Sequence, residues 1–129
     1  MVKNVAVVSL SAGVLGESIA KHELDIGAKR LADYGLNVRF MPHALAGIKY
    51  IKNHPEDRAA DLLAAFRDPE IDMILCAIGG DDTYRLAPYL FANGELETAV
   101  SGTDKIFLGF SDTTVNHMML HKVGVKTFY

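Results

Sequence analysis

The chain has 129 residues, half of them hydrophobic and 22% charged, with a net charge of -3. This size and balance predict a single globular domain, residues 1–129, with a core of its own. A negative net charge without a basic stripe argues against a nucleic-acid partner, and no apolar run approaches the ~18 residues that a membrane span needs.

The amino terminus has a feature of secretory signal peptides, because Lys3 precedes an apolar run. Ser9, Ser11 and Gly13 interrupt that run, and no small-residue cleavage site follows. A first buried strand is therefore favoured over export. The only cysteine, Cys76, lies in the apolar string MILCAI, which favours a packed core thiol and is consistent with a reducing, cytoplasmic setting.

Strands and helices alternate along the chain. Pro55, at the first turn of one helix, and the acidic residues behind it are typical of a helix start. We expect strands at 5–10, 36–41, 71–78 and 104–110, helices at 19–35, 54–70, 84–91 and 113–124, an ambiguous segment at 42–54, and a last strand beginning at 125. We expect this last strand to be unpaired or loosely held. The alternation predicts a parallel α/β sheet, a Rossmann-like (flavodoxin-like) fold with three layers.

Three loops follow strands of this predicted sheet and are rich in glycine, serine and aspartate. They are residues 9–13, 79–82 and 109–112. Because ligands bind at the carboxyl ends of parallel strands, these loops are expected to share one cleft.

Ser111 lies in the string GFSD, between a strand and a helix. Such a turn can expose a nucleophilic hydroxyl beside backbone N–H groups, as in the G-x-S-x-G elbow, although the second glycine is absent here. Alternatively, Ser111 or Asp112 caps the helix that starts near Thr113. The local pattern leaves both readings open.

A nucleophilic serine needs a base, and none is evident near Ser111 in the sequence. The histidines are His22, His43, His54, His117 and His121. His117 lies about 9 Å along the helix axis from the turn, too far to reach Ser111 squarely. His117 and His121 have the i, i+4 spacing of metal ligands but lack the glutamate of H-E-x-x-H and a third ligand, so no metal is expected.

The string GGDDT places Gly79 and Gly80 directly after a strand. Bare glycine N–H groups can line an anion or oxyanion site, whereas the simpler interpretation is a tight turn with Asp82 capping the next helix. The string also differs by one residue from the G-G-D-G-T loop of sugar and dinucleotide kinases. Asp82 in place of glycine weakens that phosphotransferase interpretation.

Ser9, Ser11, Gly79 and Asp81 are further candidates for lining the cleft, although Ser9 and Ser11 can equally end the first strand. The string SLSAGVLGES lacks both G-x-G-x-x-G and the P-loop lysine. No cofactor is therefore expected.

Three strings together resemble the amino-terminal domain of the serine LD-carboxypeptidases, which include muramoyltetrapeptide carboxypeptidases and microcin C immunity proteins. They are VAVVSLSAG, RAADLLAAFRDPEIDMILCAIGGDDTYRLAPYL and KIFLGFSDTTVNHMMLHKVGVKTFY, in the family's order. The GGDDTYRL version looks closer to the microcin immunity branch.

The resemblance implies a serine hydrolase with a Ser–Glu–His triad. Ser111 matches the nucleophile, and the backbone N–H groups of Gly80 and Asp112 match the oxyanion hole. The family's glutamate and histidine belong to a carboxy-terminal domain that is absent from these 129 residues, so we expect the chain alone to be inactive. The implied substrate is a small peptide or an aminoacyl-nucleotide.

Two other functions remain as alternatives: a non-catalytic binding or interaction domain of the same fold, and the phosphotransferase of the G-G-D-G-T kind. A half-enzyme would also expose the apolar surface that its missing partner covers, which predicts a homo-oligomer.

Overall fold

The computed structural model describes residues 1–129 as a five-stranded, fully parallel sheet. The strands are β1 (Asn4–Val8), β2 (Asn37–Phe40), β3 (Met73–Cys76), β4 (Ile106–Leu108) and β5 (Thr127–Phe128), in the order β2-β1-β3-β4-β5. This order is that of the flavodoxin-like doubly wound sheets, so the predicted α/β fold class is confirmed.

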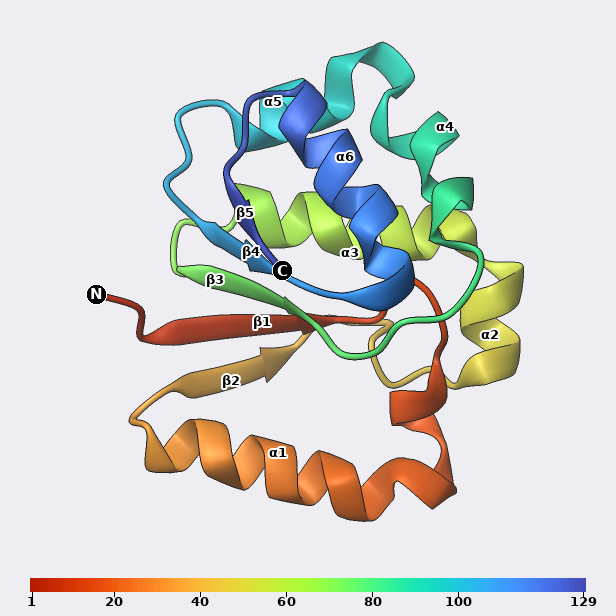
Figure 1. The fold of residues 1–129 in the computed structure, drawn as a ribbon, viewed down its shortest axis with the longest axis vertical. Coiled ribbons are helices and arrows are strands. Elements are labelled where there is room, and N and C mark those ends of the chain that lie inside the picture. The colour runs from red at the N-terminus through yellow and green to blue at the C-terminus, as the bar shows by residue number, and fades with distance from the viewer.

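The helices lie unequally on the two faces of the sheet, with α1 alone on one face and α3, α5 and α6 on the other (Figure 1). They are α1 (Lys21–Asp33), α2 (Ile48–Asn53), α3 (Pro55–Arg67), α4 (Ala87–Leu90), α5 (Glu95–Val100) and α6 (Thr114–Lys122). None of them combines the length and the apolarity that crossing a membrane requires.

The main core lies between the sheet and helices α3 to α6, as a cluster of 20 buried apolar residues. Ile74 and Phe107 are fully buried within it, and Cys76 is 4% exposed. Burial raises the pKa of the Cys76 thiol to about 12, against the opposing effect of a hydrogen bond with Thr113. The expectation of a packed core thiol is therefore confirmed.

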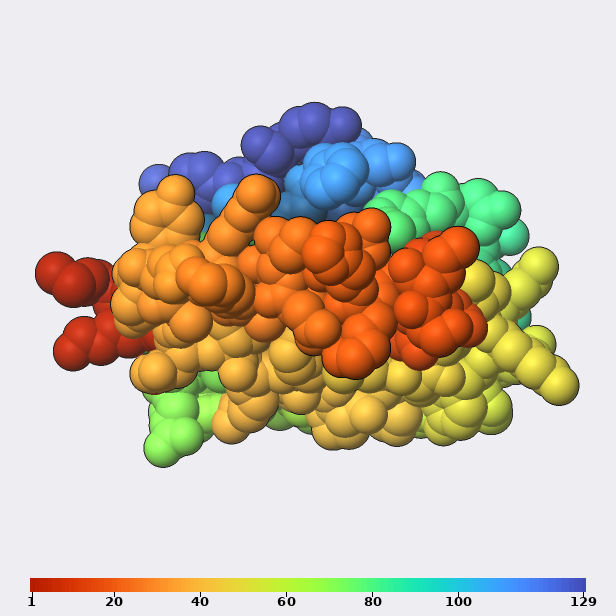
Figure 2. Space-filling model, turned by 90° about the horizontal axis from the view of Figure 1, so that it is seen from below, coloured from red at the N-terminus to blue at the C-terminus, as the bar shows by residue number.

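The opposite face of the sheet carries a continuous row of apolar side chains. Strand register aligns Phe40, Val7, Leu75, Leu108 and Phe128 across all five strands. Since residues in register in a parallel sheet share a face, this row lies on the α1 side. Seen from that side, the atoms of the α1 segment, in orange, lie in front of the sheet (Figure 2).

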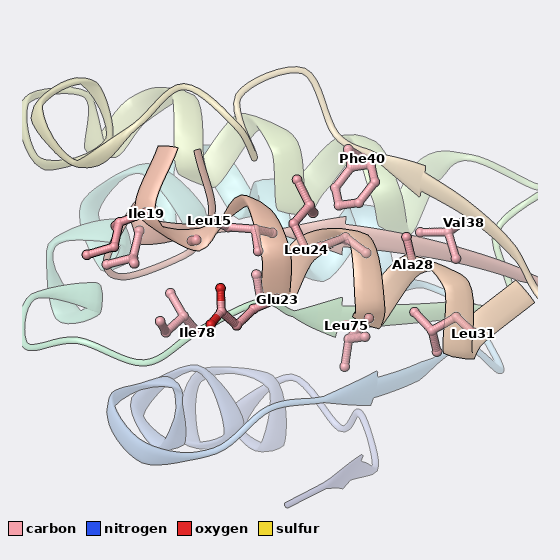
Figure 3. A pocket seen from close by; sticks show the side chains of 15 residues that line it. Leu15, Ile19, Glu23, Leu24, Ala28, Leu31, Val38, Phe40, Leu75 and Ile78 are labelled. Carbon is pink, nitrogen blue, oxygen red and sulfur yellow. The ribbon is translucent and has the colours of Figure 1, made fainter. Parts of the chain in front are cut away.

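Helix α1 stands over β1 and β2 without a single buried residue. Between the helix and the sheet lies a groove of about 480 Å³, lined almost entirely by apolar side chains. In Figure 3, Leu24 and Leu31 from the helix face Val38 and Leu75 from the strands. Ile19, beside this groove, is 82% exposed. The α1 face therefore lacks the full cover that parallel sheets normally have.

Several local expectations need correction. The last strand is not loose, because β5 pairs in parallel with β4. Residues 42–54, left ambiguous, contain α2, and α5 lies in a segment for which no element was expected. The single helix expected at 84–91 divides into a 3₁₀ turn (Thr83–Leu86) and α4, with Pro88 in the first turn of α4.

A buried arginine connects α3 to two of the loops at the carboxyl edge of the sheet. Arg58 is fully buried, and its Nη1 donates to the carbonyls of Leu10 (3.0 Å) and Ser11 (3.2 Å) and to Asp82 Oδ1 (2.8 Å). Burial disfavours ionisation of Asp82, but Arg58 and Arg85 together lower the pKa of its carboxyl group. The ion pair explains why Asp82 does not cap the turn that follows it, as one sequence interpretation expected.

Hydrogen bonds to a carboxylate also link two distant segments at the amino edge of the sheet. Asp72 Oδ2 accepts hydrogen bonds from the backbone N–H groups of Lys3 and Asn4, both at 2.8 Å. These bonds lower the pKa of the Asp72 carboxyl group.

The first prediction concerns Arg58. Arg58→Met removes the charge and leaves Asp82 with only Arg85, so we expect the free energy of unfolding in urea to fall by about 3–5 kcal/mol. The matched control, Arg85→Met, removes the exposed partner of the same carboxylate and should cost less than about 1 kcal/mol. Equal losses for the two variants would contradict the assigned role of Arg58.

The second prediction concerns pH. Because the folded-state pKa of Asp72 is lowered, its stabilisation is present above the ordinary carboxyl pKa of about 4 and is lost as the pH falls through the folded-state value. Asp72→Ala should therefore lower Tm at pH 7, and the difference from the unsubstituted chain should shrink below about pH 4. The exposed Asp104, changed to Ala, serves as control. A difference in Tm that stays constant down to low pH would refute this assignment.

Candidate active site

The three polar loops meet at the carboxyl edge of the sheet, as the sequence predicted. The Ala12 N–H donates to the Gly79 carbonyl across the first two loops (3.1 Å). The Ser11 hydroxyl donates to Asp112 across the first and third loops (2.5 Å). The loops that follow β1, β3 and β4 are thus bound directly to one another.

Ser111 occupies the tip of the third loop in a left-handed backbone conformation, with φ of +60°. This conformation costs a residue with a side chain about 1–2 kcal/mol and is concentrated at functional sites. Ser111 is exposed, and its backbone N–H donates to the Tyr129 hydroxyl at 3.3 Å. The turn therefore exposes Ser111 in a left-handed conformation between a strand and a helix, as in a nucleophile elbow.

Side chains from the start of α6 and the turn before it hold this strained turn. Three consecutive carbonyls each accept one side-chain hydrogen bond: Gly109 from His117 Nε2 (2.7 Å), Phe110 from the Thr113 hydroxyl (2.7 Å) and Ser111 from the Thr114 hydroxyl (2.6 Å). Because a carbonyl only accepts, the His117 proton is on Nε2. Sequence reasoning missed these supports, although the Thr-Thr pair directly after Ser-Asp was a usable signal.

Gly79 lies against the serine. A Cβ atom at position 79 would be 2.8 Å from Ser111 Cβ and 2.9 Å from Ser111 Oγ. Any side chain there would collide with the nucleophile candidate. The glycine therefore permits the second loop to pack directly on the elbow.

Asp112 does not cap a helix. No side-chain cap is formed at the 3₁₀ turn Ser111–Thr113 or at α6. Asp112 Oδ2 instead accepts hydrogen bonds from the Ser11 hydroxyl and from the Thr83 backbone N–H (2.9 Å). The capping interpretation of the GFSD string is therefore wrong for Asp112.

The remaining candidates for the cleft differ in their surroundings. Ser9 is buried, and its hydroxyl donates to the Ala44 carbonyl after β2 (2.7 Å). Ser11 is buried between the other two loops, whereas Gly80 and Asp81 are exposed at the edge. The serines of the loop after β1 are thus used in internal hydrogen bonds, whereas the loop after β3 exposes its backbone at the edge of the sheet.

The histidines hydrogen-bond elsewhere. His117 is buried against Gly109, while His121 is exposed, so this pair does not present two ligand atoms to one metal ion. His43 pairs with Asp61 (2.9 Å), and His54 pairs with Glu56 (3.0 Å). Both histidines follow β2 in the chain. In the sheet, β2 is separated by β1 and β3 from β4, the strand that leads to Ser111.

The comparisons with known proteins agree with this geometry. Residues 5–129 match the family described as LD-carboxypeptidase N-terminal domain. The murein tetrapeptide carboxypeptidase of Pseudomonas aeruginosa is 29% identical over 112 residues, which are 87% of this chain and 35% of that protein. The chain spans about a third of the length of the curated relatives it matches.

Solved structures extend the comparison. An MccF-like protein from Streptococcus pneumoniae, in complex with AMP, is 62% identical with a TM-score of 0.97, over 100% of this chain and 37% of that one. The microcin C7 self-immunity protein MccF, in complex with aspartyl sulfamoyl adenosine, is 25% identical with a TM-score of 0.79, over 98% and 36%. Together with the family match, these findings show that the chain belongs to the LD-carboxypeptidase N-terminal domain family.

Proposed function

We propose that this chain carries the nucleophile of a serine hydrolase of the carboxypeptidase or amidase type, and that Ser111 is that nucleophile. The supporting observation is the exposed, left-handed turn at Ser111, with Gly79 packed against its side chain. Family membership favours this activity over the phosphotransferase that the GGDDT string also suggests.

In the proposed reaction, Ser111 Oγ attacks the carbonyl carbon of a peptide or amide bond. The carbonyl oxygen becomes an oxyanion, which the backbone N–H groups of Gly80 and Asp112 stabilise. The Ser111 proton passes through a base to the leaving amine as the C–N bond breaks, and water then releases the acyl group from Ser111.

The base is the part of this mechanism that we place outside these 129 residues. The hydrogen bonds of His43, His54 and His117 go to Asp61, Glu56 and the Gly109 carbonyl. We place the glutamate and histidine of the triad in the part of the relatives' length that this chain does not span. On this proposal the 129 residues alone catalyse little or no hydrolysis.

The substrate class follows from the relatives. Two of them were crystallised with AMP and with aspartyl sulfamoyl adenosine, and another is named a murein tetrapeptide carboxypeptidase. A small peptide or an aminoacyl-nucleotide is therefore the proposed substrate.

We place the activity in the cytoplasm, where the buried thiol of Cys76 stays reduced.

A second proposal concerns assembly, and its proposed partner is a second copy of this chain. The apolar row on the α1 face continues past the helix to Leu108 and Phe128, and Phe128 is 53% exposed. No helix of this chain covers that half of the face (Figure 1). Packing two such faces together removes both from water, so we propose a homodimer.

The third prediction tests the nucleophile. In the product of the whole coding region that contains these residues, Ser111→Ala should lower kcat for a tetrapeptide or an aminoacyl-sulfamoyl nucleotide by ~10⁴-fold or more, with ligand binding largely retained. Ser101→Ala, at the opposite edge of the sheet, is the matched control.

Three results would count against the proposal. Unchanged turnover in Ser111→Ala would remove Ser111 as the nucleophile. Ligand binding without turnover in the unsubstituted protein would favour a non-catalytic binding domain. A thermal shift with ATP and Mg²⁺ would instead support the phosphotransferase.

The fourth prediction tests assembly. Light scattering of the 129-residue chain should give twice the 14.1 kDa monomer mass at micromolar concentration. The double substitution Ile19→Glu with Phe128→Glu places charges on the apolar face and should give monomers. Tyr34→Glu, an exposed change at the end of α1, should leave the dimer intact. A monomeric unsubstituted chain would overturn the proposal.

A further inference from the structure

The carboxylate of Asp112 joins all three loops of the candidate site. Its Oδ2 accepts one hydrogen bond from the Ser11 hydroxyl and one from the Thr83 N–H, at 2.5 and 2.9 Å. Ser11 lies 101 positions away along the chain, in the loop after β1, and Thr83 follows the paired glycines. A single side chain, next in sequence to Ser111, thus fixes the elbow to both neighbouring loops.

The Ser11 hydroxyl also contacts Gly80. A Cβ atom on Gly80 would be 2.2 Å from Ser11 Oγ and 2.8 Å from the Ala12 backbone nitrogen. The hydroxyl is therefore wedged between the backbone of Gly80 and the carboxylate of Asp112. These are the two residues whose N–H groups are the proposed oxyanion donors, so the Ser11 hydroxyl lies between them.

The backbone of Ser11 is also held by a hydrogen bond from α3. The fully buried Arg58 donates to the carbonyls of Leu10 and Ser11. Thr83 is likewise held, because its hydroxyl donates to Asn116 Oδ1 of α6 at 2.8 Å. Both donors to Asp112 are therefore held by further hydrogen bonds, and the carboxylate fixes the position of the elbow relative to them.

We propose that the Asp112 carboxylate is a positioning residue that sets the separation of the Gly80 and Asp112 N–H groups. This inference rests on the proposed function, in which those two groups stabilise the oxyanion. Oxyanion donors act at about 2.7–3.1 Å from the developing charge, and misplacement by about 1 Å costs ~10²-fold in rate. The side chain acts through Ser11 and Thr83 without contacting the substrate.

The fifth prediction uses graded substitutions. Asp112→Ala removes both hydrogen bonds, and Ser11→Ala removes one. Asp112→Asn can place its amide oxygen where Oδ2 lies, so it keeps an acceptor for both the Ser11 hydroxyl and the Thr83 N–H without the charge. The matched control is Asp72→Ala, because the Asp72 carboxylate also accepts two hydrogen bonds from a distant segment, here from two backbone N–H groups at the opposite edge of the sheet.

The first readout is independent of activity. In amide NMR spectra, Asp112→Ala should shift the Gly80 resonance and speed hydrogen exchange at Thr83, and Asp112→Asn should restore most of both. Ser11→Ala should move Gly80 more than Thr83. If Gly80 is unmoved in a folded Asp112→Ala variant, or if Asp72→Ala moves it equally, the positioning role is lost. If Asp112→Ala fails to fold, Ser11→Ala and Asp112→Asn decide by the same signals.

The second readout is the rate at which a fluorophosphonate labels Ser111 in the product of the whole coding region, because the proposed base lies outside these 129 residues. An Oγ–P bond forms, fluoride leaves and the hydroxyl proton goes to that base, while the phosphoryl oxygen occupies the oxyanion site. Asp112→Ala should slow labelling roughly 100-fold relative to the unsubstituted chain, Asp112→Asn should recover most of that loss, and Asp72→Ala should label normally. Equal labelling of Asp112→Ala and the unsubstituted chain would overturn the inference.

The two readouts separate this inference from the proposed function. Ser111→Ala must remain unlabelled for the label to report on the nucleophile. If the unsubstituted product of the whole coding region is not labelled either, the proposed nucleophile fails. The Gly80 and Thr83 signals then still decide whether Asp112 sets the spacing of the loops.

Discussion

The left-handed backbone of Ser111 is the constraint on which the surrounding structure depends. A serine in this conformation is stable only if its neighbours make the alternatives worse. Side chains of His117, Thr113 and Thr114 bond the three carbonyls of the turn, so relaxing the turn would break several hydrogen bonds at once. Those side chains belong to the start of α6 and the turn before it. The hydrogen bonds that stabilise the strained turn therefore form only together with the helix.

The buried charge of Arg58 acts one step further out. A guanidinium without exposed area is unfavourable in an apolar interior unless its donors are satisfied. Two backbone carbonyls of the first loop and the Asp82 carboxylate meet that requirement, although Nε has no partner. The need to pair this cation therefore draws the first and second loops together. Asp112 then connects both to the third loop, so hydrogen bonds join all three loops at this edge of the sheet.

The sequence predicted those features that depend on local pattern. Unbroken apolar runs predicted the strands around Val7 and Ile74, and Pro55 with the acids behind it predicted the start of α3. The pattern failed where long-range contacts decide. Asp82 and Asp112 carry the composition of helix caps, but Arg58 in one case and Ser11 in the other compete for the carboxylate. The strand beginning at residue 125 was expected to be unpaired or loosely held, but it pairs with β4, the strand that precedes it across α6.

The ion pair at Asp82 also bears on the choice between the two chemistries that the GGDDT string allows. A phosphate loop needs bare N–H groups and no negative charge beside them. Here the carboxylate of Asp82 stands two residues after Gly80, and its pKa is lowered, so it is ionised at neutral pH. Arg58 and Arg85 both pair with this carboxylate and largely compensate its charge, so neither arginine is left free to bind a phosphate. An amide carbonyl is neutral in the ground state and gains charge only in the transition state, so two backbone N–H groups suffice to bind it. The same carboxylate that opposes a phosphate site is therefore compatible with acyl transfer at Ser111.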